Sequence, residues 1–391
     1  MVDNIAKRWR QLSGEEHWKN ILDPLDIDLR RYLVHYGDMA HITYDTFNTE
    51  RASKFCGSSR YGKADLLSKV GLVKTNPLMQ YQITKFFYAT SSIPLPATFF
   101  LTPLSREAWC KESNWMGYVA VATDDGKKVL GRRDIVIAWR GTVQPLEWLT
   151  DLEFGLVPGD DLFGEAANTM IHEGWHSMYT SDDPRSQYNK SCAREQLYKK
   201  EEMSITVVGH SLGASMATLS AADIVANGLT NPKRGWTCPK PILVTAFAFA
   251  SPRVGDLEFR QLTRNMHSLR VLRVTNNLDL VTTYPLLGYA DIGEELRIDT
   301  LQSPYVRNPG STSAWHNLQA YLHGIAGTQG LKGGFKLEIP RDIALLNRTI
   351  DGLKDNYGVP IKWWCEKNKG MIQQANGCWV LHDHEEIEIE M

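Results

Sequence analysis

Hydrophobic positions follow two different spacings along the chain, and the change between them predicts its elements. Between residues 28 and 47, apolar side chains recur three and four residues apart, which is typical of a helix packed on a core. They are Leu29, Tyr32, Leu33, Tyr36, Met39 and Ala40. We therefore expect the first stretch of the chain, to about residue 76, to be helical.

β-type sequence follows and then gives way to an alternating order. The runs 117–122 and 135–139 flank Asp124-Asp125-Gly126 and predict an antiparallel pair of strands. Beyond Gly141 the pattern predicts strands at 205–208, 243–250 and 269–275, and helices near 171–180, after Ser211, near 256–266 and near 317–325. Alternation of this kind predicts a mainly parallel sheet with helices on both faces.

Ser211 stands at one of the strand-to-helix changes. The run Ile205–Val208 predicts a buried strand, and the alanine-rich residues 214–225 predict a helix that ends at Asn227-Gly228. Between them, Gly209-His210-Ser211-Leu212-Gly213 has the G-x-S-x-G form of a nucleophile elbow, in the strand-turn-helix context that this motif requires. The sequence therefore predicts an α/β-hydrolase fold with Ser211 as its nucleophile.

A serine nucleophile needs a base, and the base needs an orienting carboxylate, in the chain order Ser, Asp or Glu, His. Asp279 comes just past a predicted strand, where a parallel sheet presents its ligand-facing loops. We expect it to be the acid. Its rivals are Asp256, Asp291 and Asp299, which suit a helix cap, a turn or a surface charge better.

Two histidines downstream of Ser211 compete for the role of base. His267 lies at the junction before a strand, and His382 and His384 lie in an acidic tail, which leaves His316 and His323. The two are seven residues apart, about 10 Å along a helix, so only one can reach the serine. We expect the base to be His316, on the loop that enters the last helix, and His323 to cap or pack that helix.

The oxyanion of acyl transfer needs two preorganised donors. The backbone N–H of Leu212, directly after the nucleophile, is one. Thr142, which follows Gly141 at the end of a predicted strand, is the candidate for the other, although an ordinary strand-ending turn remains an alternative. In the segment that follows, Leu146 is the expected contact for acyl chains, whereas Trp148 is expected to pack in the core.

Composition and charge exclude several classes of protein. The chain has 391 residues, with 43 Lys and Arg against 45 Asp and Glu, and no basic stripe that would bind nucleic acid. No apolar run is long enough for a transmembrane segment, and no signal peptide is evident, so we expect a cytoplasmic protein. The six cysteines lack metal-ligand spacing and are expected to be free thiols, with no metal or other cofactor.

Six blocks in order along the chain resemble the class 3 lipases, also called the fungal-lipase-like family. The blocks are Ala138–Thr142 with Trp148–Leu152, His172–Trp175, Gly209–Gly213, Ala250–Asp256 and Asn276–Val281. They fall within residues 115–330. The flanks, namely residues 9–26, 28–47, 355–360 and 363–371, resemble the plant phospholipase A1 group without a plastid-targeting extension.

The resemblance implies a single α/β-hydrolase domain over residues 1–391. It would have an N-terminal helical extension (1–76), a lipase core (115–330) and a C-terminal extension with an acidic tail (331–391). The implied activity is hydrolysis of the sn-1 acyl ester of glycerophospholipids at a membrane interface, without a cofactor. The resemblance also implies Ser211, Asp279 and His316 as the triad, and Thr142 with Leu212 at the oxyanion.

Two alternatives remain open from the sequence. One is hydrolysis of galactolipids or triacylglycerols, because pocket shape sets the preference for head group and acyl chain. The other is a lipase-like interaction protein without turnover, since a fold does not fix a function.

Overall fold

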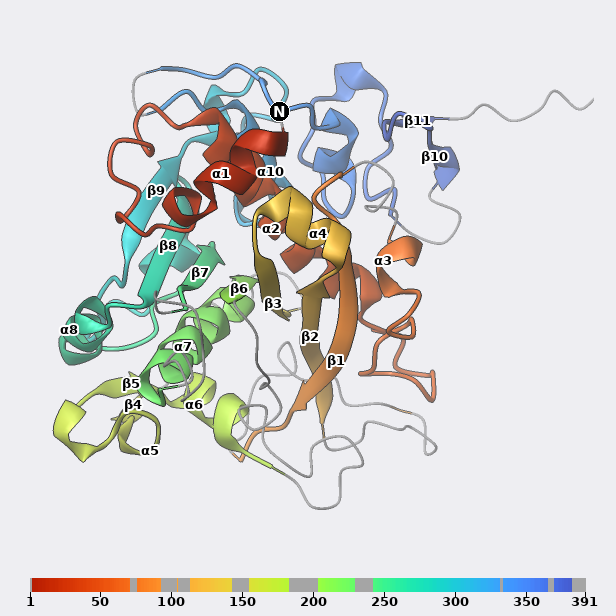
Figure 1. The fold of residues 1–391 in the computed structure, drawn as a ribbon. Coiled ribbons are helices and arrows are strands. Elements are labelled where there is room, and N and C mark those ends of the chain that lie inside the picture. The colour runs from red at the N-terminus through yellow and green to blue at the C-terminus, as the bar shows by residue number, and fades with distance from the viewer. Residues whose placement is uncertain are drawn as a thin grey trace, which may run out of the picture.

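A seven-stranded sheet forms the centre of the molecule (Figure 1). The computed structural model describes residues 2–70, 76–92, 104, 113–142, 155–182, 203–228, 242–330, 333–364 and 369–381. The strands, in their order across the sheet, are β1 (Tyr81–Ala89), β2 (Asn114–Ala122), β3 (Arg133–Trp139), β6 (Met203–His210), β7 (Val244–Phe249), β8 (Leu269–Asn276) and β9 (Glu294–Ile298). From β3 to β9 the neighbours are parallel, and β1 and β2 extend one edge in antiparallel pairing.

Helices and short hairpins connect and cover these strands. The α-helices are α1 (Val2–Leu12), α2 (Ile27–Thr46), α3 (Leu66–Lys69), α4 (Asp124–Leu130), α5 (Asp160–Phe163), α6 (Glu173–Thr180), α7 (Leu212–Ala226), α8 (Leu257–Asn265), α9 (Thr312–Trp315) and α10 (Leu318–Gly327). The 3-10 turns are η2 (Glu165–Ala167), η4 (Leu280–Thr283), η5 (Thr300–Gln302), η6 (Ile343–Asn347) and η7 (Asp355–Tyr357). Two small hairpins pair β4 (Leu156–Pro158) with β5 (Met170–His172), and β10 (Met371–Gln373) with β11 (Trp379–Leu381).

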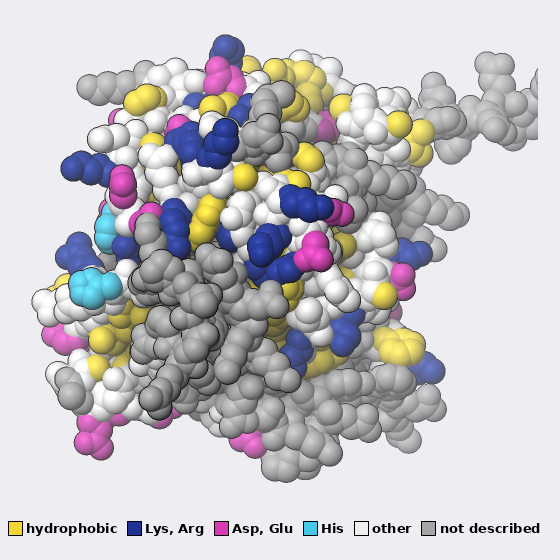
Figure 2. Space-filling view, in the orientation of Figure 1, with side chains coloured by type: hydrophobic (Ala, Val, Ile, Leu, Met, Phe, Trp, Pro, Cys, Tyr) yellow, Lys and Arg dark blue, Asp and Glu magenta, His cyan; other side chains and the backbone are white. Residues whose placement is uncertain are grey.

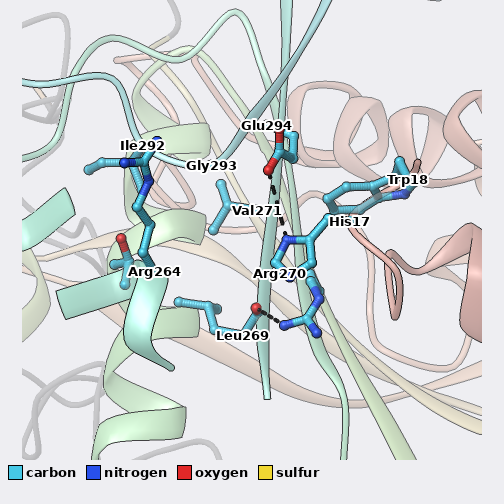
Figure 3. Close-up of a pocket in the computed structure, with 10 residues that line it drawn as sticks. His17, Trp18, Arg264, Leu269, Arg270, Val271, Ile292, Gly293 and Glu294 are labelled. Carbon is cyan, nitrogen blue, oxygen red and sulfur yellow. Dashed lines mark hydrogen bonds and ion pairs between the residues drawn. The ribbon is translucent and has the colours of Figure 1, made fainter. Parts of the chain in front are cut away.

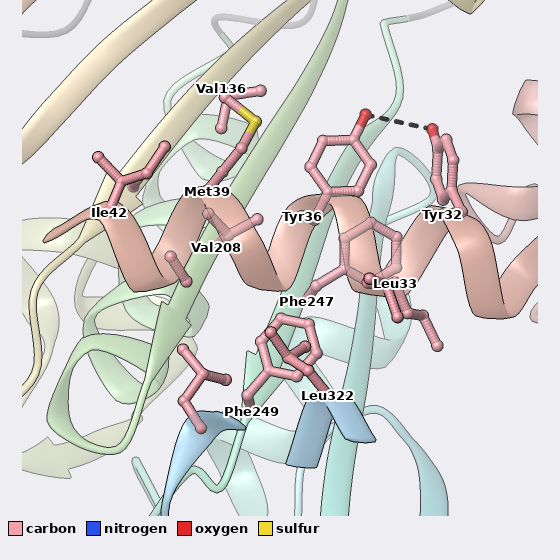
Figure 4. Close-up of a cluster of buried hydrophobic side chains, with 14 of the residues drawn as sticks. Tyr32, Leu33, Tyr36, Met39, Ile42, Val136, Val208, Phe247, Phe249 and Leu322 are labelled. Atoms are coloured by element: carbon pink, nitrogen blue, oxygen red, sulfur yellow. Dashed lines mark hydrogen bonds between the residues drawn. The ribbon is translucent and has the colours of Figure 1, made fainter. Parts of the chain in front are cut away.

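Alternation along the central strands divides the core into two layers. Val208 and Phe247 join the buried cluster that contains α2 and α10, whereas Val207 and Ala246 join the cluster that contains α7. Successive side chains of a strand point to opposite faces, so a continuous apolar strand serves both layers. Figure 4 shows the first layer, in which side chains of α2 meet those of the strands and of α10.

A buried carboxylate fastens α2 to the start of β3. Asp134 accepts hydrogen bonds from the hydroxyls of Tyr36 (2.7 Å) and Tyr81 (2.8 Å), and from those of Ser204 and Thr206. Burial opposes its ionisation, but Arg132 and these hydroxyls hold the pKa of Asp134 below its usual value. The first helical layer is thus fixed to the sheet by polar contacts as well as by packing.

The predicted α/β order is confirmed, with local differences. The antiparallel pair of β2 and β3 is present, but the residues between them form helix α4, because Thr123 caps it by accepting from Gly126 N–H at 3.1 Å. The N-terminal stretch is less helical than predicted: residues 13–25 form turns, and residues 47–65 form turns and bends with a bridge between Phe47 and Ser59. Strands β1 and β9 were not predicted. The predicted acyl contact Leu146, with Trp148, and the acidic tail from residue 382 lie outside the described residues.

The described surface is mixed in character. On the face drawn in Figure 2, lysine and arginine side chains are scattered among acidic and apolar ones. Within the described ranges, the helices are too short or too polar for any of them to cross a bilayer. The buried Cys56 and the exposed Cys378 are free thiols.

Candidate active site

Ser211 occupies a strained turn between β6 and α7. Its φ of 58° and ψ of −128° lie in a region that residues with a side chain rarely adopt. Its N–H donates to the carbonyl of Phe249 on β7 at 2.9 Å, which holds the turn on the sheet. A Cβ at Gly209 would overlap the backbone of Gly213, so this glycine lets β6 and α7 approach closely, and a Cβ at Gly213 would overlap the carbonyl of Trp139 at the end of β3.

The three side chains predicted to act together are in hydrogen-bond contact. Nε2 of His316 lies 2.9 Å from Oγ of Ser211, and Nδ1 lies 2.7 Å from Oδ2 of Asp279. The carboxylate can only accept, so Nδ1 carries the proton and Nε2 is free to accept from the serine hydroxyl. This arrangement allows a base to deprotonate a nucleophile while a carboxylate orients the base.

Further donors hold Asp279 in place. Oδ1 accepts from the backbone N–H of Val281 at 3.0 Å, at the start of η4. Oδ2 also accepts from the hydroxyl of Tyr321 at 2.6 Å, and that hydroxyl in turn accepts from the N–H of Asn276. Burial and the nearby Asp279 raise the pKa of Tyr321 well above its usual value, so its hydroxyl stays a donor.

The rival acids have other roles. Asp256 caps α8 by accepting from Phe259 N–H at 2.8 Å, and Asp299 caps η5 by accepting from Leu301 N–H. Asp291 pairs with Arg253 at 3.0 Å. Each rival therefore has the structural or surface role that the sequence favoured for it.

His323 also lies away from the serine. It is buried inside α10, where its Nε2 is 2.7 Å from Oγ of Ser303 and its ring stacks on Phe335. Burial lowers the pKa of His323 to about 3. It therefore packs as a neutral side chain, as predicted for the histidine that is not the base.

The loop that carries Thr142 runs beside the nucleophile elbow. Trp139 at the end of β3 pairs with Gly209, and a Cβ at Gly141 would overlap the carbonyl of His210. Arg140 fixes this loop by donating to the carbonyl of Gly141 at 2.8 Å and to that of Trp115 at 2.9 Å. Thr142 directly follows Gly141 in this loop and is buried, and its role at the oxyanion stays a prediction.

The reacting groups are shielded in this conformation. Ser211 is 1% exposed and His316 is 7% exposed. In the part of the chain that the structure describes, no three His, Cys, Asp or Glu side chains are grouped closely enough to hold a metal ion.

A separate hollow lies at the opposite end of the sheet, between the start of β8 and the start of β9 (Figure 3). Its wall includes His17, Arg264, Arg270 and Glu294, and Nδ1 of His17 is 3.8 Å from Oε1 of Glu294. Arg270 donates to the backbone carbonyls of Gly14, Glu15, His267 and Leu269. Its donors are engaged in holding the N-terminal turn on the sheet, so the hollow is not the candidate site.

Sequence reasoning missed three polar side chains around the triad. They are Tyr321, on the helix after His316; His210, the variable second position of G-x-S-x-G; and Tyr44, near the end of α2. His210 lies within the G-x-S-x-G motif, and the presence of a histidine at its second position was the one sequence feature that could have pointed to this residue. Tyr44 is 166 residues away from its partner, so no local pattern points to the contact.

Comparisons with known proteins match the whole chain and its core separately. A family model described as Lipase (class 3) matches residues 136–289. Phospholipase A1-IIgamma of Arabidopsis thaliana is 53% identical over 97% of this chain and 94% of its own length. Phospholipase A1-II 1 of Oryza sativa subsp. japonica is 49% identical over 98% of each chain. Among solved structures, the nonglycosylated LIP2 lipase of Yarrowia lipolytica is similar with a TM-score of 0.43 and 17% identity, over 70% of this chain and 81% of that one. The likeness to the two plant proteins thus extends through the N-terminal helices and the C-terminal residues.

Proposed function

Because the chain belongs to the phospholipase A1-II group of the class 3 lipase family, we propose that it hydrolyses the sn-1 acyl ester of glycerophospholipids. The observation that carries the proposal is the continuous hydrogen-bonded series from Ser211 through His316 to Asp279. The similarity to plant phospholipases A1 supports the substrate class, and the geometry of these three side chains supports serine-based acyl transfer.

Acylation begins when Oγ of Ser211 attacks the ester carbonyl and His316 Nε2 takes the serine proton. The imidazolium that forms is stabilised by Asp279, and the oxyanion accepts from the N–H of Leu212 and from Thr142. Collapse of the tetrahedral intermediate breaks the ester bond. His316 returns the proton to the departing alkoxide, which leaves as a lysophospholipid.

Deacylation repeats these steps with water. His316 takes a proton from the water as its oxygen attacks the acyl-serine, and then returns the proton to Ser211 as the fatty acid leaves. Each proton thus passes through Nε2 of His316, from Ser211 to the leaving group and then from water back to Ser211. No cofactor is required.

The substrate is drawn from a lipid surface, and exposed leucines support this part of the proposal. Leu280, directly after the acid, is 57% exposed, and Leu286 and Leu287 are 59% and 90% exposed. The loop that carries the last two is fixed, because the N–H and the Nη1 of Arg253 donate to the carbonyls of Tyr284 and Pro285. Fixed, exposed apolar side chains suit contact with acyl chains.

The deciding experiment is hydrolysis of a lipid panel with positional analysis of the lyso product. Phosphatidylcholine with different acyl chains at sn-1 and sn-2 should release the sn-1 fatty acid, and wild type should react with a fluorophosphonate probe at Ser211. Release from sn-2, or hydrolysis only of galactolipids or triacylglycerols, would replace the proposed substrate. Absence of both turnover and labelling would favour the interaction protein. Location in the cytoplasm stays a prediction from the sequence.

A further inference from the structure

Tyr44 reaches the candidate active site from the N-terminal helices. It lies near the end of α2, far outside residues 136–289 that the class 3 lipase model matches. Its hydroxyl oxygen is 2.8 Å from Nδ1 of His210 and 3.4 Å from the carbonyl oxygen of the same residue. A side chain of the N-terminal extension thus touches the residue next to the nucleophile.

His210 also contacts the backbone of the base, His316. Its Nε2 is 2.7 Å from the backbone carbonyl oxygen of His316. Because a carbonyl only accepts, Nε2 must carry the proton, which leaves a lone pair on Nδ1 for the hydroxyl of Tyr44 to donate to. Burial, and next the proximity of His316, keep the pKa of His210 well below its usual value, so the ring stays neutral and this single tautomer holds.

The same hydroxyl touches the loop expected to bind the oxyanion. A Cβ at Gly141 would overlap the phenol oxygen of Tyr44, so this glycine is what lets the loop and the hydroxyl approach. Thr142 follows directly. The hydroxyl of Tyr44 therefore stands between the loop that ends β3 and the nucleophile elbow, and through His210 it reaches the loop of His316.

The end of α2 is itself held firmly. Asp45 receives a hydrogen bond from Arg348 at 2.8 Å, and the guanidinium of Arg140 lies 3.9 Å from the ring centroid of Phe47. Tyr118 on β2 donates to the carbonyl of Met39 at 2.8 Å. A hydroxyl on so well anchored a helix has a fixed position, as a positioning group needs.

We propose that Tyr44 is a positioning residue for the triad: its hydroxyl, acting through His210, fixes the backbone of His316 and so keeps His316 Nε2 against Oγ of Ser211. The inference rests on the proposed function, because it assigns a role in that reaction. It makes the N-terminal extension a part of the catalytic unit. Misplacement of a reacting group by less than an ångström is enough to slow catalysis severely.

The first test is Tyr44→Phe, which removes the hydroxyl and keeps the ring. With a water-soluble chromogenic ester as substrate, we expect kcat to fall about tenfold and KM to change less than about twofold, since one oriented hydrogen bond acts on the reacting geometry. The matched control is Tyr36→Phe on the same helix, whose hydroxyl binds Asp134 at the other end of the sheet. That variant should melt earlier and keep its kcat.

The second test places the effect at His210. A Gln side chain can still donate to the carbonyl of His316 and a Leu cannot, so His210→Gln should keep roughly ten times more kcat than His210→Leu. In the His210→Leu background, adding Tyr44→Phe should cost nothing further, because the hydroxyl acts through the imidazole. If Tyr44 had only a structural role, the losses of kcat in the two single variants would multiply in the double variant.

Two results would overturn the inference: an unchanged kcat in Tyr44→Phe, or full additivity in the double variant. Failure of the proposed function is distinguishable from both. In that case wild type itself would hydrolyse no ester, and the fluorophosphonate probe would not label Ser211. If Tyr44→Phe does not fold, the comparison of Gln and Leu at His210 still decides whether a donor to the carbonyl of His316 is needed.

Discussion

The hydroxyl of Tyr321 donates at 2.6 Å to Oδ2 of Asp279. The same oxygen accepts from His316 Nδ1. The carboxylate that orients the base is thus itself oriented from α10, the helix that begins two residues after His316. Base and acid are therefore positioned by one short stretch of chain.

Tyr321→Phe should lower kcat about tenfold, because Asp279 loses a donor and with it part of its orientation. Stability should fall by about 1–3 kcal/mol, since the buried N–H of Asn276 loses its acceptor. Ester kinetics and thermal melts measure the two effects. Tyr81→Phe, which loses its hydrogen bond to Asp134 at the start of β3, is the control that should lose stability alone. Equal kcat in the two variants would contradict a role for Tyr321 at the site.

His316→Gln should be nearly inactive, whereas His323→Gln should keep most of its kcat. The first loses the only group in hydrogen-bond contact with both Ser211 and Asp279 among the described residues. The second variant loses a contact with Ser303, which lies away from Ser211. Both variants are assayed against the same ester, with far-UV circular dichroism to confirm folding. The opposite ranking would refute the assignment of the base.

Ser211→Ala and Ser211→Gly should both lose turnover, by a factor that approaches 10⁶. Their stabilities should differ. At φ 58° a methyl group is strained and glycine is not, so the Gly variant should be more stable than the Ala variant by about 1–2 kcal/mol. Thermal melts of the two proteins measure the difference. An Ala variant as stable as the Gly variant would show that the turn stores no strain.

Folding stability should fall as the pH drops below 6.5, because burial lowers the pKa of several histidines. They are His35, His172 and His323, each to about 3, and His41 and His210. These side chains stay neutral when folded and bind protons when unfolded. At one pH unit below 6.5, each of these histidines lowers the free energy of unfolding by about 1.4 kcal/mol.

Asp45 partly offsets this loss, since burial raises its pKa to about 6 and its protonation favours the folded state at low pH. Denaturant unfolding at pH 7.5, 6.5 and 5.5 gives the slope. His323→Gln should reduce the number of protons that the protein binds on unfolding below pH 6.5 by about one. Stability that does not change between pH 7.5 and 5.5 would contradict the prediction.

The double variant Leu286→Ser/Leu287→Ser should lose most of its activity on phospholipid vesicles and keep its activity on a soluble ester. Both side chains are largely exposed, so the fold loses little packing. Leu381→Ser is the matched control, because Leu381 is 52% exposed on β11 in the C-terminal extension. If the control loses as much vesicle activity, the loop of Leu286 and Leu287 is not the lipid-binding element.

The sequence predicted those parts of the fold that have a local signature. The elbow at Ser211 combines an apolar strand, two glycines and an alanine-rich helix, and all of these lie within one short segment. The edge strand β9 has the opposite character: three of its five residues are exposed and charged. Strand β9 forms because it pairs with β8, and not because its own side chains are apolar. Its hydrophobic pattern therefore does not predict it.

The candidate site divides in the same way. Chain order and loop context pointed to Asp279 and His316, together with the resemblance to the class 3 lipases, because the motif sets the order of the residues that follow the serine. Tyr44 and Tyr321 lie on helices whose apolar spacing accounts for a tyrosine as a core residue. Only the three-dimensional contact shows that their hydroxyls reach His210 and Asp279.

Only 1% of the surface of Ser211 is exposed, so a reagent or an acyl chain has little access to it in this conformation. If each turnover and each labelling event follows an opening of the protein, that motion takes microseconds to milliseconds. The rate of covalent inactivation will therefore rise with reagent concentration and then level off at the opening rate. That plateau will be the same for a sluggish and a reactive inhibitor, because the protein's own motion sets it.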